Sequence, residues 1–287
     1  MTDVTDHKSK EWCERIDLHC HSTASDGDLS PTELIRRARD KGVTALALTD
    51  HDTLSGLAEA RIAAAEAGLH LIPGMEVSCV WRKVTLHIVA LNFGFDNAVM
   101  KELEQRQLTA RRARAESIAA VLITKKLPDL LADAIAKAPS GIPGRPHFAQ
   151  VMIERGIVKS MDEAFKKYLG AGKVGDVQSG WMTMQEVMPI LNEAGASSVI
   201  AHPCKYKLSW MKLRELFGEF KDLGGTALEV AVAGHTPNEV RTLALECQRF
   251  GLKASRASDF HSPKYSWAEL GSAPRMPEAV VPVWADW

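Results

Sequence analysis

The first apolar run of the chain ends in a pair of histidines with the spacing of metal ligands. Residues 16–18 lead directly into His19 and His21. On an extended strand, side chains two residues apart point to the same side, so both imidazoles can coordinate one ion. Asp259 and His261 repeat this spacing after a later apolar run. The recurrence favours a hydrolase that uses several metal ions.

Further His, Asp and Glu residues stand at or soon after the ends of other apolar runs, except His87, which lies within its run. A single histidine in such a place is more often a structural residue than a ligand, but together these residues favour a metal centre. Nitrogen and oxygen ligands without thiolates suit Zn, Mn or Fe. The candidate metal ligands are His19, His21, Asp26, His51, Glu76, His87, His202, Asp259 and His261.

The apolar runs predict short strands, and helical patterns separate most of them. Capping boxes or prolines open several of these helices, and glycines close them. Alternating strands and helices favour a mainly parallel sheet or barrel, in which the carboxyl ends of the strands meet on one face. The predicted strands are residues 16–19, 44–49, 69–77, 84–91, 198–201, 228–232 and 252–257, and the predicted helices between them are 30–41, 56–67, 183–195 and 237–250.

The strand pattern disappears between Asp96 and Val174, where the sequence becomes helical. Proline and glycine clusters separate or follow the helices predicted there. We therefore expect an α/β barrel interrupted by a helical insertion. The predicted helices of the insertion are residues 97–126, 128–138, 146–155 and 160–168, and the predicted parts of the chain are a loose tail at 1–12, a metal-binding barrel at 13–95 and 175–287, and an inserted substrate-clamp domain at 96–174.

Six motifs, in order along nearly the whole chain, resemble those of the PHP (polymerase and histidinol phosphatase) superfamily. The helical insertion is similar to that of the subfamily of 3′,5′-nucleoside bisphosphate phosphatases and 5′-3′ exoribonucleases, rather than to the histidinol phosphatases. The motifs are His19-Cys20-His21-Ser22-x-x-Ser25-Asp26-Gly27, Leu48-Thr49-Asp50-His51-Asp52, Gly74-Met75-Glu76-Val77-Ser78, Leu86-His87-Ile88-Val89, Ile200-Ala201-His202-Pro203 and Ser258-Asp259-Phe260-His261.

The resemblance implies a distorted (β/α)7 TIM-like barrel with two to three divalent ions and with Glu76, His202 and Asp259 at the catalytic centre. Asp26 stands where many family members have histidine, which would change the identity or affinity of one ion. The implied ligand sets are His19, His21, Glu76 and Asp259 for one ion, Asp26, His51 and His202 for a second, and Glu76, His87 and His261 for a third, with Glu76 bridging.

Substrate specificity requires cations outside the ligand set. Residues 101–173 hold 14 Lys or Arg against 8 Asp or Glu, which fits an anionic substrate, although solvated helix faces would explain the same count. The sequence departs from the family pattern at two positions. Cys204 stands where the family often has glycine, and Asp176 stands where an aromatic residue is common. For each implied contact, a solvated surface cation remains the alternative. The implied substrate contacts are Arg145, His147, Lys173, Lys205 and His235.

The expected reaction is hydrolysis of the 3′-phosphate of a nucleoside 3′,5′-bisphosphate, with Arg145 and His147 holding the 5′-phosphate. Closely spaced divalent ions neutralise phosphoryl charge and activate water, so no serine or cysteine nucleophile is required. The same geometry would degrade short 5′-phosphorylated RNA in the 5′-3′ direction. Because the net charge is −1, we expect a small nucleotide or short RNA as partner rather than sequence-specific DNA. Protein partners are not predicted.

Three other functions stay open from the sequence. One is another PHP phosphatase acting on a small phosphomonoester. A second is an HD-type phosphohydrolase, suggested by the neighbours His51 and Asp52. The third is an inactive metal-binding interaction module.

The composition also bounds where the protein works. No apolar stretch reaches the roughly 18 residues of a membrane span, and the N-terminus is polar, so a cytoplasmic protein with no membrane partner is expected. The 5 cysteines form no C-x-x-C pair, which favours reduced thiols.

Overall fold

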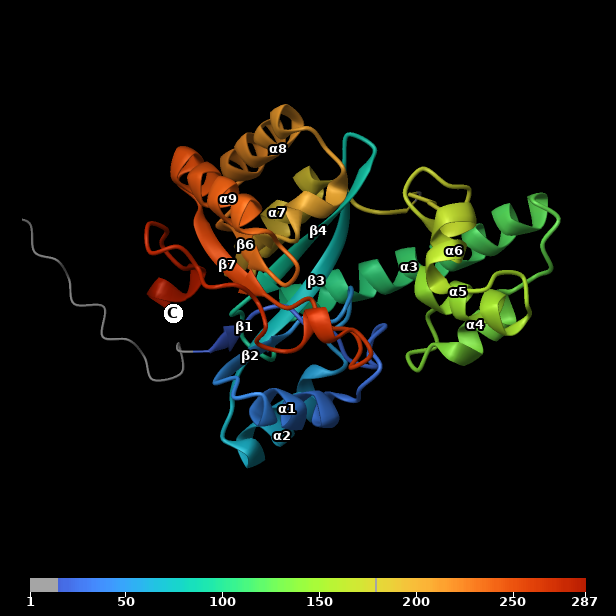
Figure 1. Cartoon of the computed structure of the whole chain (residues 1–287), viewed down its shortest axis with the longest axis horizontal. Coiled ribbons are helices and arrows are strands. Elements are labelled where there is room, and N and C mark those ends of the chain that lie inside the picture. Colours follow the sequence, from blue (N-terminus) through green and yellow to red (C-terminus); the bar gives the residue numbers. More distant parts are fainter. Residues whose placement is uncertain (1–14, 179) are drawn as a thin grey trace, which may run out of the picture.

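The computed structural model describes residues 15–178 and 180–287. The tail predicted at residues 1–12 lies outside the described residues. One sheet of seven strands runs in chain order, and β1 approaches β7 closely enough for Leu18 N to donate to Arg256 O at 3.0 Å, so the sheet nearly closes into the expected distorted barrel (Figure 1). The strands are β1 (Ile16–Asp17), β2 (Ala45–Leu48), β3 (His70–Trp81), β4 (Val84–Leu91), β5 (Ser197–Ile200), β6 (Ala227–Val232) and β7 (Lys253–Ala257).

Strand β4 runs opposite to its neighbours, whereas every other pair in the sheet is parallel. β3 continues to Trp81, beyond its predicted end at Val77, and only Arg82 and Lys83 separate it from β4. Two residues are too few for a parallel crossover, and their positive φ angles of 43° and 69° suit a tight hairpin. Consequently the early part of β4 lies at the edge where the other strands end, and His87 pairs with Ser78 of β3 there.

The four helices predicted between strands are present, and three of them begin with a capping box. A further helix, α8, was not predicted. Its N-cap Ser209 accepts a hydrogen bond from Lys212 N, and its buried residues recur at helical spacing from Leu213 to Phe220. The helices around the barrel are α1 (Pro31–Asp40), α2 (Leu57–Ala67), α7 (Met184–Glu193), α8 (Trp210–Asp222) and α9 (Pro237–Phe250).

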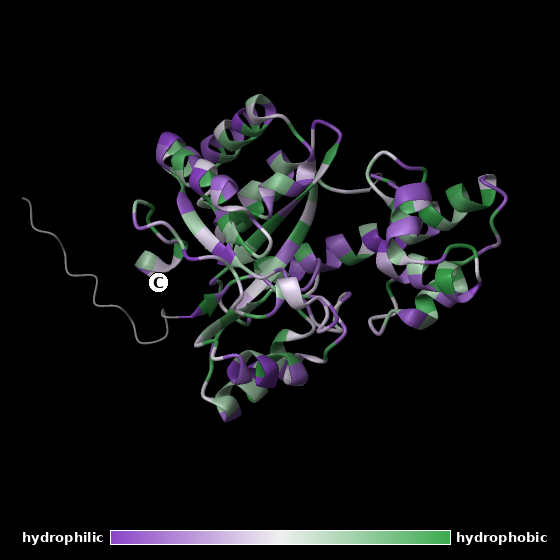
Figure 2. Ribbon diagram, viewed as in Figure 1, coloured by the Kyte–Doolittle hydropathy of each residue, from purple (hydrophilic) through white to green (hydrophobic). Residues whose placement is uncertain are grey.

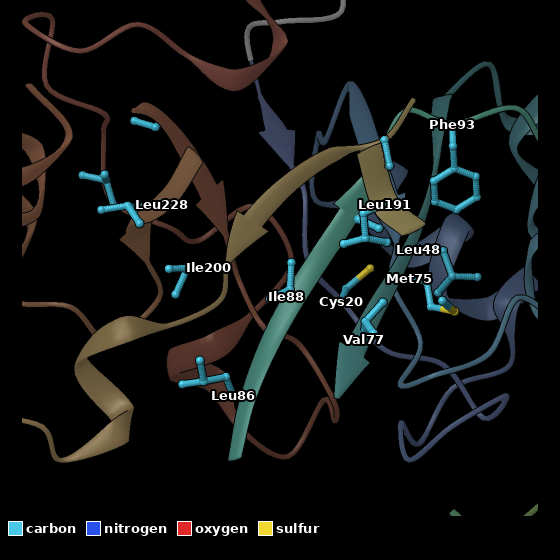
Figure 3. Packing of buried hydrophobic residues seen from close by; sticks show 14 of the residues in the cluster. Cys20, Leu48, Met75, Val77, Leu86, Ile88, Phe93, Leu191, Ile200 and Leu228 are labelled. Carbon is cyan, nitrogen blue, oxygen red and sulfur yellow. The ribbon is translucent and has the colours of Figure 1, made fainter. Parts of the chain in front are cut away.

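The main core lies between the sheet and these helices. Figure 3 shows Leu86 and Ile88 along β4, with Ile200 and Leu228 to one side and Met75 to the other. A second cluster of small and branched residues, including Ile16, Ala45 and Val199, fills the barrel interior. Apolar residues accordingly follow the strands in Figure 2, while the outer helices combine an apolar and a polar face.

The insertion extends to one side of the barrel in Figure 1 and has its own apolar cluster, which includes Ile118, Phe148 and Leu169. Its first helix is long enough to begin beside the barrel and end among the other inserted helices. The domain boundaries given above stay a prediction. The inserted elements are α3 (Ala98–Thr124), α4 (Leu131–Lys137), α5 (Arg145–Glu154), α6 (Met161–Ala164) and a π-helical turn (Phe165–Leu169).

Within the described residues, no helix is both long and apolar enough to cross a membrane. The cytoplasmic location stays a prediction. The four described cysteines are unpaired thiols, as expected, and Cys13 lies outside the described residues.

Candidate metal centre

Glu76 is the centre of the candidate site. It lies on β3, fully buried, and ring nitrogens from five histidines approach its carboxylate. The ends of the parallel strands and the reversed β4 bring these histidines together from four parts of the sequence. The distances to Oε2 are 3.1 Å from His19 Nε2, 3.2 Å from His21 Nε2 and 2.9 Å from His51 Nδ1, and those to Oε1 are 2.8 Å from His87 Nδ1 and 3.1 Å from His202 Nε2.

The polar atoms of this cluster fit divalent metal ions. His51 Nδ1, His87 Nδ1 and Glu76 Oε2 are buried and have no hydrogen-bond partner, although His51 and Glu76 approach to 2.9 Å. These polar atoms therefore converge without well-formed hydrogen bonds to satisfy them. Buried polar atoms left unpaired are costly, and an ion between them would satisfy them. Imidazole and carboxylate donors suit Zn, Mn or Fe.

Three groups of side chains have donor atoms near enough to share an ion. Among the described residues, these groups reproduce the expected ligand sets only in part, because His202 and Asp259 belong to no group and His21 and His51 each belong to two. His261 lies beside Asp26, with Nε2 3.5 Å from Oδ1, and takes the place expected for His202, which instead contacts Glu76. The groups are His21, Asp26, His51 and His261; His19, His21 and Glu76; and His51, Glu76 and His87. Asp259 Oδ1 lies 3.7 Å from His19 Nε2 and 3.5 Å from His21 Nε2.

The backbone around the site is strained in several places. His202 and Asp259 have positive φ angles of 29° and 55°, which are uncommon for residues other than glycine. Gly27 closes the loop that carries Asp26, because a Cβ there would lie 2.4 Å from His21 O. Such strain concentrates where a side chain must be aimed at a functional site.

Two acceptors orient the histidine rings. The carboxylate of Glu229 on β6 accepts from His19 Nδ1 at 2.7 Å and from the His202 backbone N at 2.6 Å. The Asp259 carbonyl lies 2.9 Å from His261 Nδ1. A carboxylate and a carbonyl in these places favour the tautomer with the hydrogen on Nδ1, so Nε2 of each ring is the atom that faces the centre.

The carboxylates of the centre are held in the charged form. Burial raises the pKa of Glu76, but the histidines around it, chiefly His51 and His19, outweigh burial and hold that pKa well below its ordinary value. Burial lowers the pKa of His51 to about 4, although the neighbouring carboxylates of Glu76 and Asp26 raise it.

Three arginines stand on the insertion side of the centre, and only Arg145 was expected from the sequence. Arg111, Arg114 and Arg145 line a hollow of about 160 Å³ together with ligand candidates such as His51. Trp181 also lines it, with the guanidiniums of Arg111 and Arg114 each 5.6 Å from its ring. A signal existed in the sequence, because Gln107, Arg111 and Arg114 recur at helical spacing and form a polar stripe on α3.

The expected departure at Asp176 has a structural consequence. Its Oδ1 lies 3.1 Å from Arg145 Nη1, and its Oδ2 accepts from Gly172 N at 2.8 Å. The carboxylate thus fixes the arginine in place instead of offering an aromatic surface.

The other expected substrate contacts fall into two groups. His147 lines a small recess with Asp26 and His51, and Lys205 is paired with Asp259 at the centre. Lys173 has an exposed side chain and is not among the lining residues of the hollows at the centre. His235 lies in a different hollow, beside α9 and the C-terminal loop, so the structure does not bring it to the centre.

The HD-type alternative requires ligands on helices. His51 instead follows strand β2, and Asp52 accepts from Ser78 N at 2.6 Å and from Arg111 Nε at 2.7 Å. Asp52 therefore connects the barrel to the insertion and is not among the grouped ligand atoms.

Comparisons with known proteins agree with this geometry. Residues 17–130 match the PHP domain model. The chain is 41% identical over 271 residues to a 5′-3′ exoribonuclease of Haemophilus influenzae, covering 94% of this chain and 98% of that protein. It is 37% identical over 277 residues to a 3′,5′-nucleoside bisphosphate phosphatase of Chromobacterium violaceum, covering 94% and 95%. A solved structure of an amidohydrolase from the same organism, with bound sulfate and no metal, superposes with a TM-score of 0.87 at 36% identity and covers 94% of each chain.

Proposed function

The chain belongs to the PHP domain family, and we propose that it is a metal-dependent phosphoesterase that removes the 3′-phosphate of nucleoside 3′,5′-bisphosphates and shortens 5′-phosphorylated RNA in the 5′-3′ direction. The observation that carries the proposal is the position of three arginines beside a His and carboxylate centre. The arginines would bind the negative charge of the substrate, and the histidines and carboxylates would bind the metal ions. Both relatives named above act, by their names, on substrates of this kind.

The residues around Glu76 would hold two or three divalent ions, of Mn, Zn or Fe. We assign the ligand role to the nine residues expected from the sequence, with His261 rather than His202 beside Asp26. We assign the catalytic centre to Glu76, His202 and Asp259. When bound, such ions neutralise the phosphoryl oxygens and lower the pKa of a water molecule.

The arginines would hold the 5′-phosphate. Arg145 is fixed by Asp176, and Arg111 is fixed by Asp52, so both guanidiniums are oriented before substrate arrives. Planar guanidiniums bind phosphate oxygens through two parallel hydrogen bonds. His147 would add a neutral donor, because its Nδ1 accepts from Gly144 N at 3.0 Å and its proton therefore stays on Nε2.

This arrangement explains the direction of RNA degradation. If the three arginines hold a terminal 5′-phosphate, the phosphate that reaches the ligand cluster is the one attached to the 3′-oxygen of the same nucleoside. A free 3′-phosphate is released as inorganic phosphate. A phosphate esterified to the next nucleotide, when attacked in the same way, leaves a shortened RNA with a new 5′-phosphate.

The role of the arginines is tested with two substrates that differ only in the 5′-phosphate. These are adenosine 3′,5′-bisphosphate and adenosine 3′-monophosphate. Arg145→Ala should reduce kcat/KM for the bisphosphate by about 10-fold to 100-fold, the cost of a lost hydrogen bond to a charged group. It should leave hydrolysis of the monophosphate and the metal content unchanged. Arg155→Ala, at the exposed C-terminal end of the same helix, is the matched control. Equal losses on both substrates would refute the assignment of Arg145.

A further inference from the structure

A second hollow opens from the ligand cluster and has no assigned role. Its volume is about 510 Å³, and it shares Asp26 and Phe165 with the arginine-lined hollow. Asp259 and His261 of the ligand cluster also line it, and α5 of the insertion contributes Gln150 to its wall. The hollow therefore continues the substrate path beyond the ligand cluster, between the barrel and the insertion.

Two exposed aromatic side chains line this hollow. Tyr265 is 45% exposed and Trp267 is 58% exposed, with their ring centroids 6.4 Å apart. They lie in the segment that follows β7, which crosses the front of the barrel in Figure 1 (orange-red). Among the described residues, these are the only aromatic side chains of such exposure. Large aromatic surface left open to solvent commonly marks a binding site.

The segment that carries the two rings is held rigidly. Ser262 Oγ donates to Asp28 at 2.6 Å, and Tyr265 N donates to Ser262 O at 3.1 Å. Beyond Trp267, Glu269 accepts two hydrogen bonds from Arg37, at 2.9 and 2.7 Å. A preorganised aromatic surface loses little entropy when it binds a ligand.

The backbone also supports the tryptophan ring. A Cβ built on Gly234 would lie 3.5 Å from Trp267 Cε3, so the indole lies against a glycine that has φ +84°. The ring is held against the loop after β6, yet more than half of its surface stays exposed.

The charges around the rings favour a base over a phosphate. Lys205 is already paired with Asp259, and Lys264 with Asp28 at 3.0 Å. Asp162 adds a further carboxylate to the wall of the hollow. The wall holds four carboxylates, of Asp26, Asp28, Asp162 and Asp259, against two lysines. This excess of negative charge disfavours an additional phosphate, whereas a neutral nucleobase can stack on an aromatic ring.

We propose that Trp267 and Tyr265 form a stacking surface for the nucleobase on the 3′ side of the cleaved bond. The proposal rests on the proposed function and adds a second subsite to it. The arginine hollow would hold the 5′-terminal nucleotide, and the aromatic hollow would hold the nucleotide that leaves. Because every base has a π-face, the subsite accepts any sequence.

The substrates themselves separate the two subsites. Adenosine 3′,5′-bisphosphate has no base on the 3′ side of the cleaved bond, whereas the 5′-phosphorylated dinucleotide pApA has one. Trp267→Ala should lower kcat/KM for pApA by about 10-fold, within the range for loss of one stacked base, and leave kcat/KM for the bisphosphate unchanged. Trp267→Phe should restore most of the activity on pApA. Leu245→Ala, at another exposed apolar residue, is the control and should affect neither substrate.

A binding measurement keeps the proposal testable without turnover. In pAp(2-aminopurine), the fluorescence of the second base should be quenched on binding to the wild-type protein and not to Trp267→Ala. Equal losses on pApA and the bisphosphate, or unchanged pApA hydrolysis together with unchanged quenching, would overturn the stacking surface. A change of oligomeric state in Trp267→Ala, measured by light scattering, would also overturn it, because the rings would then form a contact between copies. If wild-type protein quenches the fluorescence but hydrolyses neither substrate, the proposed function fails while the stacking surface stands.

Discussion

Arg111 Nε donates to Asp52 Oδ2 at 2.7 Å, and this pair connects the insertion to the loop that carries His51. Asp52 is fully buried, and it also accepts from Gln107 Nε2 at 2.8 Å. Asp52 of the barrel thereby positions the guanidinium of Arg111 beside the ligand cluster. In the proposed function, this pair would couple binding of the 5′-phosphate to the strand ends that carry the candidate metal ligands.

Asp52→Asn should weaken this coupling. The variant keeps the size of the side chain but loses the charge that orients Arg111, so KM for adenosine 3′,5′-bisphosphate should rise by about 10-fold or more. The metal content should not change, because Asp52 is outside the grouped ligand atoms. Steady-state kinetics and metal analysis measure the two effects. Asp96→Asn, at an exposed position, is the control, and loss of metal in Asp52→Asn would contradict this role.

Glu229→Gln should weaken metal binding although it replaces none of the candidate ligands. Its carboxylate fixes the proton of His19 on Nδ1, and removing such an outer partner reduces metal affinity by about 10-fold to 100-fold. Titration of metal-free protein with Mn, followed by metal analysis, measures the change. An unchanged affinity would mean that His19 needs no orienting acceptor.

The strand-end ligands could be predicted from the sequence because each follows a short apolar run. Alternation on a strand places His19 and His21 on one side, and barrel geometry brings distant strand ends together. The seven strands and the helical insertion were predicted on the same grounds, since apolar periodicity and capping residues are local signals.

The rest depended on tertiary contacts. The reversal of β4 was missed because the two-residue turn at Arg82 and Lys83 shows its φ angles only in the folded chain. The position of His261 beside Asp26, where His202 was expected, could not be seen, because spacing along the chain does not say which strand ends are neighbours. Arg111 and Arg114 were taken only as part of a basic segment, although a polar stripe within an otherwise apolar helix face was available as a signal.

Glu269→Gln should destabilise the fold in a pH-dependent way. Burial raises the pKa of Glu269, but hydrogen bonds from Arg37 and Lys41 outweigh it and lower that pKa from 4.5 to about 2. A lowered pKa means that the stabilisation is complete above about pH 4.5 and is lost as the pH falls toward about 2. We expect the variant to lose about 1 kcal/mol of unfolding free energy near neutral pH.

Urea unfolding at several pH values measures this loss. The difference between wild type and Glu269→Gln should shrink below pH 4.5, the unperturbed value for this carboxyl group. Glu66→Gln, at an exposed position on α2, provides the comparison. A difference that grows as the pH falls would contradict the ion-pair explanation.

Removal of metal should lower the thermal stability of the protein. The cluster around Glu76 leaves buried donor atoms unpaired, and an ion that binds only the folded state stabilises it by mass action. Chelated protein should therefore melt at a lower temperature than protein with excess Mn, and added Mn should restore the melting temperature. Equal melting temperatures for samples shown to be metal-free and metal-loaded would argue against a metal centre at this position.

The product formed from adenosine 3′,5′-bisphosphate by Mn-reconstituted protein tests the proposed function most directly. Chromatography identifies the remaining nucleotide while released phosphate is measured. The proposed function requires release of the 3′-phosphate and accumulation of adenosine 5′-monophosphate. Accumulation of adenosine 3′-monophosphate, or no release from protein shown to contain metal, would contradict it.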